Sequence, residues 1–445
     1  MTAILLSPIK RIPVPMHYQD TSVHCGLACA MMILDWLKRG AFTRPSPLPG
    51  SVMSQFRMHW WIHDQSSKDG TFWTSPAQLR MLINESPVAA SSLGGIRAYE
   101  VVGTRQEIRA LIDNELSHGR PAVVHTASSD AAPGHWVVVV GRSPILPGRD
   151  AGYFVLNPWV FNDGWAYGEK DDQPAILCYD YTGQSAPRVF VHTRGHGCVC
   201  PHWQGQDNPA IGEEFIPRLA LEERIGWGSV PPRGPEKCHA VLLSPPIQLP
   251  DIPDLFVDLK PLPPPEPFGD RILADPRFLN HAAEQLKSFG VVGRRAPAVW
   301  KRAFVDAPPT VVAIQSPSKP LVLAVWSESK DGSRLGALFD RAGNLQAAAI
   351  LRHWPIVRPP AAFARWFRSH AVRLCSPAGL ALDPQSAEIM VNEELYWKAT
   401  PHSRFPWWPF YVVRVATAAK GTVKLYVDMQ GRVHTSLRSG QRMGG

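Results

Sequence analysis

An almost continuous apolar segment lies near the start of the chain, in "CGLACAMMILDWLK" at residues 25–38. Its apolar side chains would cover most of the circumference of a helix, which is typical of a helix buried on all sides. Two further segments, 75–84 and 104–118, carry apolar residues at three- and four-residue spacing with polar residues between them. The pattern therefore predicts one central helix and two peripheral helices.

Beyond residue 120 the hydrophobic pattern changes. Short runs rich in β-branched residues, "PAVVHTA", "HWVVVVGR", "GYFVLNPW" and "RVFVHTR", alternate with Gly, Pro, Asp and Asn. Such runs predict strands of an antiparallel sheet. Helices followed by strands favour an α+β fold, in which the central N-terminal helix packs against the antiparallel sheet.

A proline-rich segment indicates where the chain divides. Residues 245–267 read "PPIQLPDIPDLFVDLKPLPPPEP", and this density of proline favours an extended, semi-rigid connector. We therefore expect a first domain at 1–240, a linker at 241–268 and a smaller α+β accessory domain at 269–445. The accessory domain is expected to contain helices at 277–290 and 360–372, strands at 310–316 and 321–328, and a closing meander at 410–417 and 422–437 that turns at Gln430-Gly431.

The two halves of the chain have net charges of opposite sign. Residues 271–445 contain 24 Lys and Arg against 11 Asp and Glu, a net charge of +13, whereas residues 1–270 contain 22 against 27, a net charge of −5. The basic excess fits an acidic partner, a polyanion, the acidic first half of the chain or a merely solvated basic surface. A nucleic-acid partner is not expected.

Composition narrows the class of protein. The 445 residues are 45% hydrophobic and 19% charged, as in a globular chain with a sizeable core. The longest apolar runs are far shorter than the roughly 20 residues of a membrane helix, and the N-terminus has no secretory pattern. Seven cysteines, an odd number, do not resemble a disulfide framework. We therefore expect no membrane span and a cytoplasmic location, with export by a non-classical route left open.

Cysteine chemistry is the first candidate for function. Cys25 begins the predicted central helix, and a helix N-terminus favours the reactive thiolate. His135 heads a predicted strand, after a glycine that would leave room beside it, and could serve as base. Asn157 ends the next strand, where antiparallel pairing would bring its side-chain oxygen to the imidazole. The Gln19 side chain and the Cys25 backbone N–H would supply two donors to an oxyanion.

The ordered motifs "QDTSVHCGLACAMM", "GHWVVVVG" and "LNPW" resemble the papain-like cysteine peptidase superfamily, and most of all the bacteriocin-leader-processing peptidases. The segment "DGTFWTSPAQLRML" is similar to the Gly-Thr-Ser helix that lies between these motifs in that family. The resemblance covers roughly residues 10–200. It implies a papain-like fold with Cys25, His135, Asn157 and Gln19 as catalytic residues. Two features depart from the family pattern: His24 precedes the cysteine, and 110 residues separate Cys25 from His135.

Each assignment has a structural alternative. Cys25 could be a buried helix cysteine, and Cys29, one turn along, is expected to belong to the core. His125 is a second candidate base, but its place inside a strand favours a core histidine. Asn157 precedes a proline and could be only a turn residue. Trp159 would either fill the core or shield the hydrogen bond between Asn157 and His135.

A cluster of potential metal ligands follows the predicted sheet: His192, His196, Cys198, Cys200 and His202. A single residue between the two cysteines departs from the usual spacing of structural zinc sites, so no metal is expected there. No phosphate-binding glycine loop, His-Glu-x-x-His or Gly-x-Ser-x-Gly motif is present, and no cofactor is expected.

These observations predict a papain-like thiol hydrolase that acts on a peptide or protein substrate through a thioester on Cys25. The accessory domain would recruit substrate or regulate access to the site. An acyltransferase or a deamidase would use the same thioester, and a binding module that has lost turnover would retain only the fold.

Overall fold

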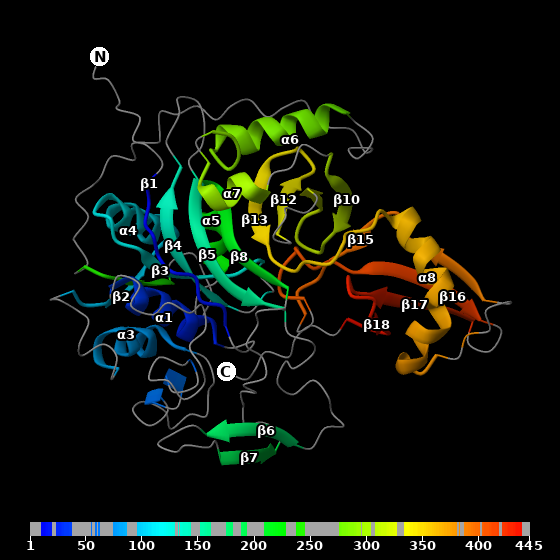
Figure 1. The fold of residues 1–445 in the computed structure, drawn as a ribbon, viewed down its shortest axis with the longest axis horizontal. Coiled ribbons are helices and arrows are strands. Elements are labelled where there is room, and N and C mark those ends of the chain that lie inside the picture. The colour runs from blue at the N-terminus through cyan, green and yellow to red at the C-terminus, as the bar shows by residue number, and fades with distance from the viewer. Residues whose placement is uncertain are drawn as a thin grey trace. The chain divides into compact units, whose positions relative to one another are not determined.

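The structure is a computed structural model of the 445-residue chain, and its described residues are 10–19, 24–37, 55, 58–59, 61–62, 74–86, 96–129, 132, 134–143, 152–161, 175–180, 188–193, 209–227, 237–244, 276–294, 296–303, 308–326, 333–380, 382, 387–400, 403–417 and 421–437. The chain forms two compact units. The first comprises Met1–Ala127 with Gly134–Leu262, and the second comprises Ser128–Pro133 with Pro263–Gly445. Figure 1 shows their helices and strands.

The longer helices of the first unit comprise three that match the predicted segments and one, at 218–227, that was not predicted. They include α1 (Cys25–Leu37), α3 (Pro76–Glu85), α4 (Arg105–Ser117) and α5 (Arg218–Trp227). Ser75 and Thr104 each form a capping box with the residue three positions further on, which satisfies two backbone N–H groups at the start of α3 and α4. The three helices predicted at 25–38, 75–84 and 104–118 are therefore confirmed within about one residue at each end.

The main sheet of the first unit is antiparallel, with strand order β8-β5-β4-β3-β9-β2. Its strands are β2 (Tyr99–Gly103), β3 (Ala122–Thr126), β4 (His135–Arg142), β5 (Gly152–Val160), β8 (Ala210–Pro217) and β9 (Cys238–Leu242). A short strand, β1 (Lys10–Arg11), pairs with β4. Strands β6 (Ala175–Asp180) and β7 (Arg188–Thr193) form a separate two-stranded sheet. Three of the four runs predicted as strands correspond to β3, β4 and β5, and the fourth corresponds to β7.

Helix α1 is the buried centre of the first unit. It packs against α3 and against β4 and β5, and its residues from Cys25 to Asp35 are all buried. Asp35 on this helix accepts a hydrogen bond from His17 over 2.9 Å, with both side chains fully buried. A buried carboxylate is tolerated only where a donor satisfies it. Movement of the segment that leads to Gln19 away from α1 would remove the His17 donor from Asp35, so this pair holds the segment against the helix.

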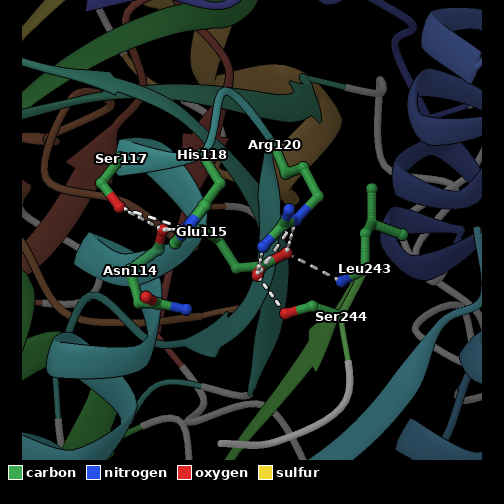
Figure 2. Close-up of polar contacts among 7 residues, drawn as sticks. All are labelled: Asn114, Glu115, Ser117, His118, Arg120, Leu243 and Ser244. Atoms are coloured by element: carbon green, nitrogen blue, oxygen red, sulfur yellow. Dashed lines mark hydrogen bonds and ion pairs between the residues drawn. The ribbon is translucent and has the colours of Figure 1, made fainter.

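A second buried carboxylate, Glu115 near the end of α4, fixes the end of β9 (Figure 2). It accepts hydrogen bonds from the Arg120 guanidinium at 2.9 to 3.2 Å, from the Leu243 backbone N–H at 3.0 Å and from the Ser244 hydroxyl. These donors replace the water that the carboxylate loses on burial. The first unit is thus packed as far as residue 244.

The expected end of the first domain at residue 240 falls inside β9, which pairs with both β2 and β3. The first compact unit extends to Leu262, and the second resumes at Pro263. Residues 245–275, which include most of the expected linker, lie outside the described residues.

The second unit contains two sheets and three α-helices among its described residues. One sheet has the order β15-β10-β11-β12-β13, antiparallel except for the β10–β15 pair, and the other has the order β14-β16-β17-β18. The elements are α6 (Pro276–Ser288), α7 (Ala298–Ala303), β10 (Thr310–Gln315), β11 (Leu321–Trp326), β12 (Arg334–Asp340), β13 (Leu345–Leu351), α8 (Pro360–Cys375), β14 (Glu388–Val391), β15 (Leu395–Tyr396), β16 (Tyr411–Thr417), β17 (Gly421–Val427) and β18 (Val433–His434).

Both units therefore combine helices with sheets that are mainly antiparallel, in agreement with the α+β class. In the described parts of the chain, no helix combines the length and the apolar character needed to cross a membrane.

Candidate active site

Cys25 is the first residue of α1, and it is a free thiol with 6% of its surface exposed. The next residue is a glycine because the chain before α3 passes close to it. A Cβ atom on Gly26 would lie 2.5 Å from the Cβ of Thr74, closer than two side chains can approach. The pair Cys25-Gly26 thus combines a thiol at the helix end with a bare backbone against which Thr74 packs.

Thr74 also connects this helix end to the strand that carries His135. Its backbone oxygen accepts a hydrogen bond from the indole Nε1–H of Trp136 over 2.8 Å. Trp136 follows His135 at the start of β4. The start of α1 and the start of β4 are therefore held to the same residue, Thr74, by close packing on one side and a hydrogen bond on the other.

The histidine and the asparagine predicted to pair do so in the structure. Nε2 of His135 lies 2.9 Å from Oδ1 of Asn157, and the two residues are only 5% and 1% exposed. Strands β4 and β5 are antiparallel neighbours, with Val138 opposite Leu156, which brings the two side chains together. Because an amide oxygen can only accept, Nε2 of His135 must carry the proton of this hydrogen bond.

The orientation of the Asn157 amide is set by two further contacts. Its Oδ1 also accepts from the Trp159 backbone N–H at 3.0 Å, and its Nδ2 donates to Oε2 of Glu214 at 2.7 Å. A backbone N–H can only donate and a carboxylate can only accept, so both contacts require the same orientation of the amide. Asn157 lies within β5 and also makes the local contact to residue 159 that turn asparagines make.

A β-bulge changes the direction of the side chains in this part of β5. Asn157 pairs with Gly212 and Val160 with Ala210, so β5 has one more residue than β8 between these pairs. Gly212 has a φ of 71°, a left-handed conformation that suits glycine. The extra residue accommodates Pro158, which has no N–H for the ladder, and bulges of this kind redirect side chains next to active sites.

Gln19 reaches the same bulge from the N-terminal segment. Its backbone N–H donates to the Pro158 carbonyl over 2.9 Å, and the residue is 2% exposed. The structure thus places Gln19 directly beside the strand segment that carries Asn157. The ordered motifs of the sequence, spread over about 140 residues, converge on the starts of α1 and β4 and the bulge of β5.

Trp159 lies beside the pair of His135 and Asn157. Its ring meets the imidazole edge-on, with ring centroids 6.3 Å apart at 81°. Trp159 is 5% exposed, so an apolar ring borders a buried hydrogen bond. Exclusion of water strengthens such a bond, as expected for a shielding tryptophan.

The other candidates take structural roles. The His125 ring packs on Trp136 at 4.7 Å between centroids, as a core histidine would. A Cβ on Gly134 would lie 2.3 Å from that ring, so the room that this glycine provides is used by His125 rather than by His135. The sequence-based explanation of Gly134 was therefore wrong. Cys29 is fully buried, which raises the pKa of its thiol well above the usual value, and the neighbouring Cys25 raises it further.

One buried residue next to the site was not predicted. Glu214 in β8 is fully buried, contacts Asn157 as described above, and lies 3.5 Å from the guanidinium of Arg224. The only signal in the sequence is a pair of glutamates inside the otherwise apolar run "AIGEEFIP". The other member of the pair, Glu213, binds Arg11 over 2.7 Å.

Most of the cluster of potential metal ligands, for which no metal is expected, lies outside the described residues. His192 lies in β7, of which only the backbone is described, and His196, Cys198, Cys200 and His202 lie outside the described residues. Among the side chains that the structure does describe, no group of three or more His, Cys, Asp and Glu is arranged to hold a metal ion.

Comparison of the chain with protein-family models finds no match. Comparison with curated proteins finds no match either. The function must therefore be inferred from the side chains of the site and their contacts.

Proposed function

We propose that the first unit is a papain-like thiol hydrolase that cleaves a peptide or protein substrate. Cys25 is the nucleophile, His135 the general base, Asn157 the residue that orients the base, and Gln19 a donor to the oxyanion. The observation that carries the proposal is the buried hydrogen bond between His135 and Asn157 on two adjacent strands, tied through Thr74 to the helix end that begins with Cys25.

The proposed reaction uses the two ring nitrogens of the His135 imidazole. Nε2–H donates to Asn157, so Nδ1 would take the proton from the Cys25 thiol. The sulfur then attacks the substrate carbonyl carbon and forms a tetrahedral oxyanion. Collapse breaks the C–N bond, and the leaving amine takes the proton back from His135. A water molecule, deprotonated by the same nitrogen, hydrolyses the thioester and regenerates the thiol.

The oxyanion requires donors that are in place before the reaction. The helix itself does not use the N–H groups of its first turn, and Cys25 opens α1. We assign the Cys25 backbone N–H and the Gln19 side-chain amide as the two donors, because the Gln19 backbone is fixed to Pro158 beside Asn157. Preorganised donors of this kind stabilise the transition state without reorganisation during the reaction.

The arrangement of elements supports a papain-like fold as part of the proposal. A buried helix that begins with the nucleophile packs on an antiparallel sheet, and neighbouring strands of that sheet carry the base and its acceptor. The described cysteines Cys25, Cys29, Cys238 and Cys375 are all free thiols, which fits the cytoplasmic location that we propose. The basic second unit would recruit an acidic substrate or partner.

Terminal-labelling proteomics tests the proposal. Lysate treated with the wild-type protein should gain new peptide N-termini that the Cys25→Ala variant does not produce. Cys29→Ala, the same substitution one helical turn along, is the matched control and should retain the activity. Product masses identify the reaction: hydrolysis adds one water per cleaved bond, deamidation replaces a side-chain amide by a carboxylate, and acyl transfer joins two substrates. If no product of any kind forms and Cys25 is not reactive, the unit is a binding module.

A further inference from the structure

Glu214 has no role in the reaction described above, yet it is one of the most deeply buried charged residues of the first unit. It is 0% exposed, accepts a hydrogen bond from Nδ2 of Asn157 at 2.7 Å and lies 3.5 Å from NH1 of Arg224. Burial of a carboxylate is strongly unfavourable unless donors surround it. The position of this charge behind the asparagine requires an explanation.

The explanation lies in the symmetry of the asparagine side chain. The two ends of an amide group have nearly the same shape, so packing alone does not distinguish Oδ1 from Nδ2. Only one orientation lets Asn157 accept from Nε2–H of His135. In the other orientation, an N–H group would face the imidazole N–H. Glu214 accepts but does not donate, and therefore favours the orientation that presents Oδ1 to His135, in addition to the Trp159 backbone N–H that donates to Oδ1.

We propose that Glu214 is a positioning residue for the thiol hydrolase: it holds the Asn157 amide in the orientation that orients His135. This inference rests on the function proposed above. Arg224 compensates the buried charge and holds the carboxylate from its other side. Glu214 and Asn157 act as a matched pair, since an aspartate at position 157 would place two carboxylates in hydrogen-bond contact.

Substitutions at Glu214 separate the hydrogen bond from the charge. Glu214→Gln keeps an oxygen that accepts from Asn157 and should retain most of the wild-type kcat. Glu214→Leu removes the acceptor and should lower kcat by about 10- to 100-fold with little change in KM, as loss of an orienting partner does in other sites. Equal kcat values for the Glu214→Leu variant and the wild type would overturn the proposal.

Glu213→Leu is the matched control. It removes the neighbouring carboxylate of β8 and leaves Arg11 without this partner, just as Glu214→Leu affects Arg224. If both leucine variants lower kcat to the same extent, Glu214 has no specific positioning role and the proposal fails. A double-mutant cycle adds a second criterion: Glu214→Leu should have almost no further effect in an Asn157→Ala background, because both act through the same hydrogen bond.

If Glu214→Leu does not fold, the contact can be tested with Asn157→Asp, alone and combined with Glu214→Gln. In Asn157→Asp, two buried carboxylates would share one proton, which raises the pKa of the pair in the folded state. The folded state then binds more protons than the unfolded state, so the variant should lose stability relative to wild type as the pH rises above about 4. Adding Glu214→Gln supplies an N–H that donates to the introduced carboxylate and should abolish this pH dependence. A single Asn157→Asp variant with the wild-type pH dependence would contradict the contact.

The rate of Cys25 alkylation distinguishes failure of this inference from failure of the proposed function. A reactive wild-type thiol that is equally reactive in Glu214→Leu, over the same pH range, overturns the role of Glu214 alone. A wild-type Cys25 that reacts no faster than free cysteine overturns the hydrolase proposal and this inference with it.

Discussion

The indole Nε1–H of Trp136 donates to the backbone oxygen of Thr74 over 2.8 Å, and so connects the strand that begins with His135 to the residue that packs on Gly26. Trp136→Phe keeps an aromatic ring but removes this donor and leaves a buried carbonyl without it. We expect a loss of about 1 to 3 kcal/mol in unfolding free energy, measured by chemical denaturation. Alkylation of Cys25 should slow as well, because the start of α1 is no longer fixed relative to β4. Unchanged stability and unchanged alkylation would show that this hydrogen bond does not fix the start of α1 relative to β4.

Gly26 provides a second test of the same junction. Gly26→Ala introduces a Cβ that would lie 2.5 Å from Thr74, so the two segments must separate. Overpacking of this kind destabilises by about 1 to 3 kcal/mol. Thr74→Gly removes the obstructing Cβ, Oγ1 and Cγ2 atoms and should restore part of the stability of the Gly26→Ala variant in the double variant, with Thr74→Gly alone as control. If the double variant is no more stable than Gly26→Ala, another contact explains the glycine.

Limited iodoacetamide treatment should modify Cys25 ahead of the other six cysteines near neutral pH. Burial raises the pKa of Cys238, with Arg105 acting in the opposite direction, and raises that of Cys375, in each case to about 11. Their thiolate fractions therefore increase only as the pH approaches that value, and their labelling should increase with it. Peptide mass spectrometry at a series of pH values measures this order. Labelling led by Cys198 or Cys200 would contradict the assignment of Cys25.

Gln19→Ala should preserve the fold and the alkylation of Cys25 but lower kcat by roughly 100-fold, as loss of one preorganised oxyanion donor does. The Gln19 backbone bond to Pro158 does not depend on the side chain, so the strand bulge should remain in place. Steady-state kinetics with a peptide substrate measures the effect, and thermal unfolding checks the fold. Normal turnover in this variant would remove Gln19 from the site.

The charge of the second half leads to a prediction about substrate choice. Residues 271–445 carry a net charge of +13, and the attraction between exposed charges is screened over about 10 Å at 0.1 M salt. If this half recruits an acidic substrate, added salt should raise KM for an acidic protein substrate while KM for an uncharged short peptide stays constant. Equal salt effects on both substrates would argue against recruitment by charge.

The elements that were predicted correctly are those with strong local signals. The apolar run of α1, the Ser and Thr caps of α3 and α4, and the β-branched runs of β3 to β5 each specify their structure through short-range physics. Two of the strands that were not predicted, β8 and β13, have contrary signals. Strand β8 contains two adjacent glutamates, and β13 contains three consecutive alanines, a residue with low strand propensity.

The pairing of His135 with Asn157 could be predicted because consecutive antiparallel strands bring such residues together. Glu214 could not, since its contact with Asn157 depends on the pairing of β5 with a strand about 50 residues further along the chain. The packing of the His125 ring against Gly134 was not predicted either, because His125 lies on the neighbouring strand, β3.

The Glu115 cluster sets the shortest fragment in which the first unit can be isolated. The donors Leu243 N–H and Ser244 Oγ come from the last described residues of this unit. A fragment that ends at 240 cuts β9 and leaves the Glu115 carboxylate with Arg120 as its remaining partner among these donors. Limited proteolysis should therefore release a stable core only when cleavage falls after Ser244, and shorter products should be degraded further.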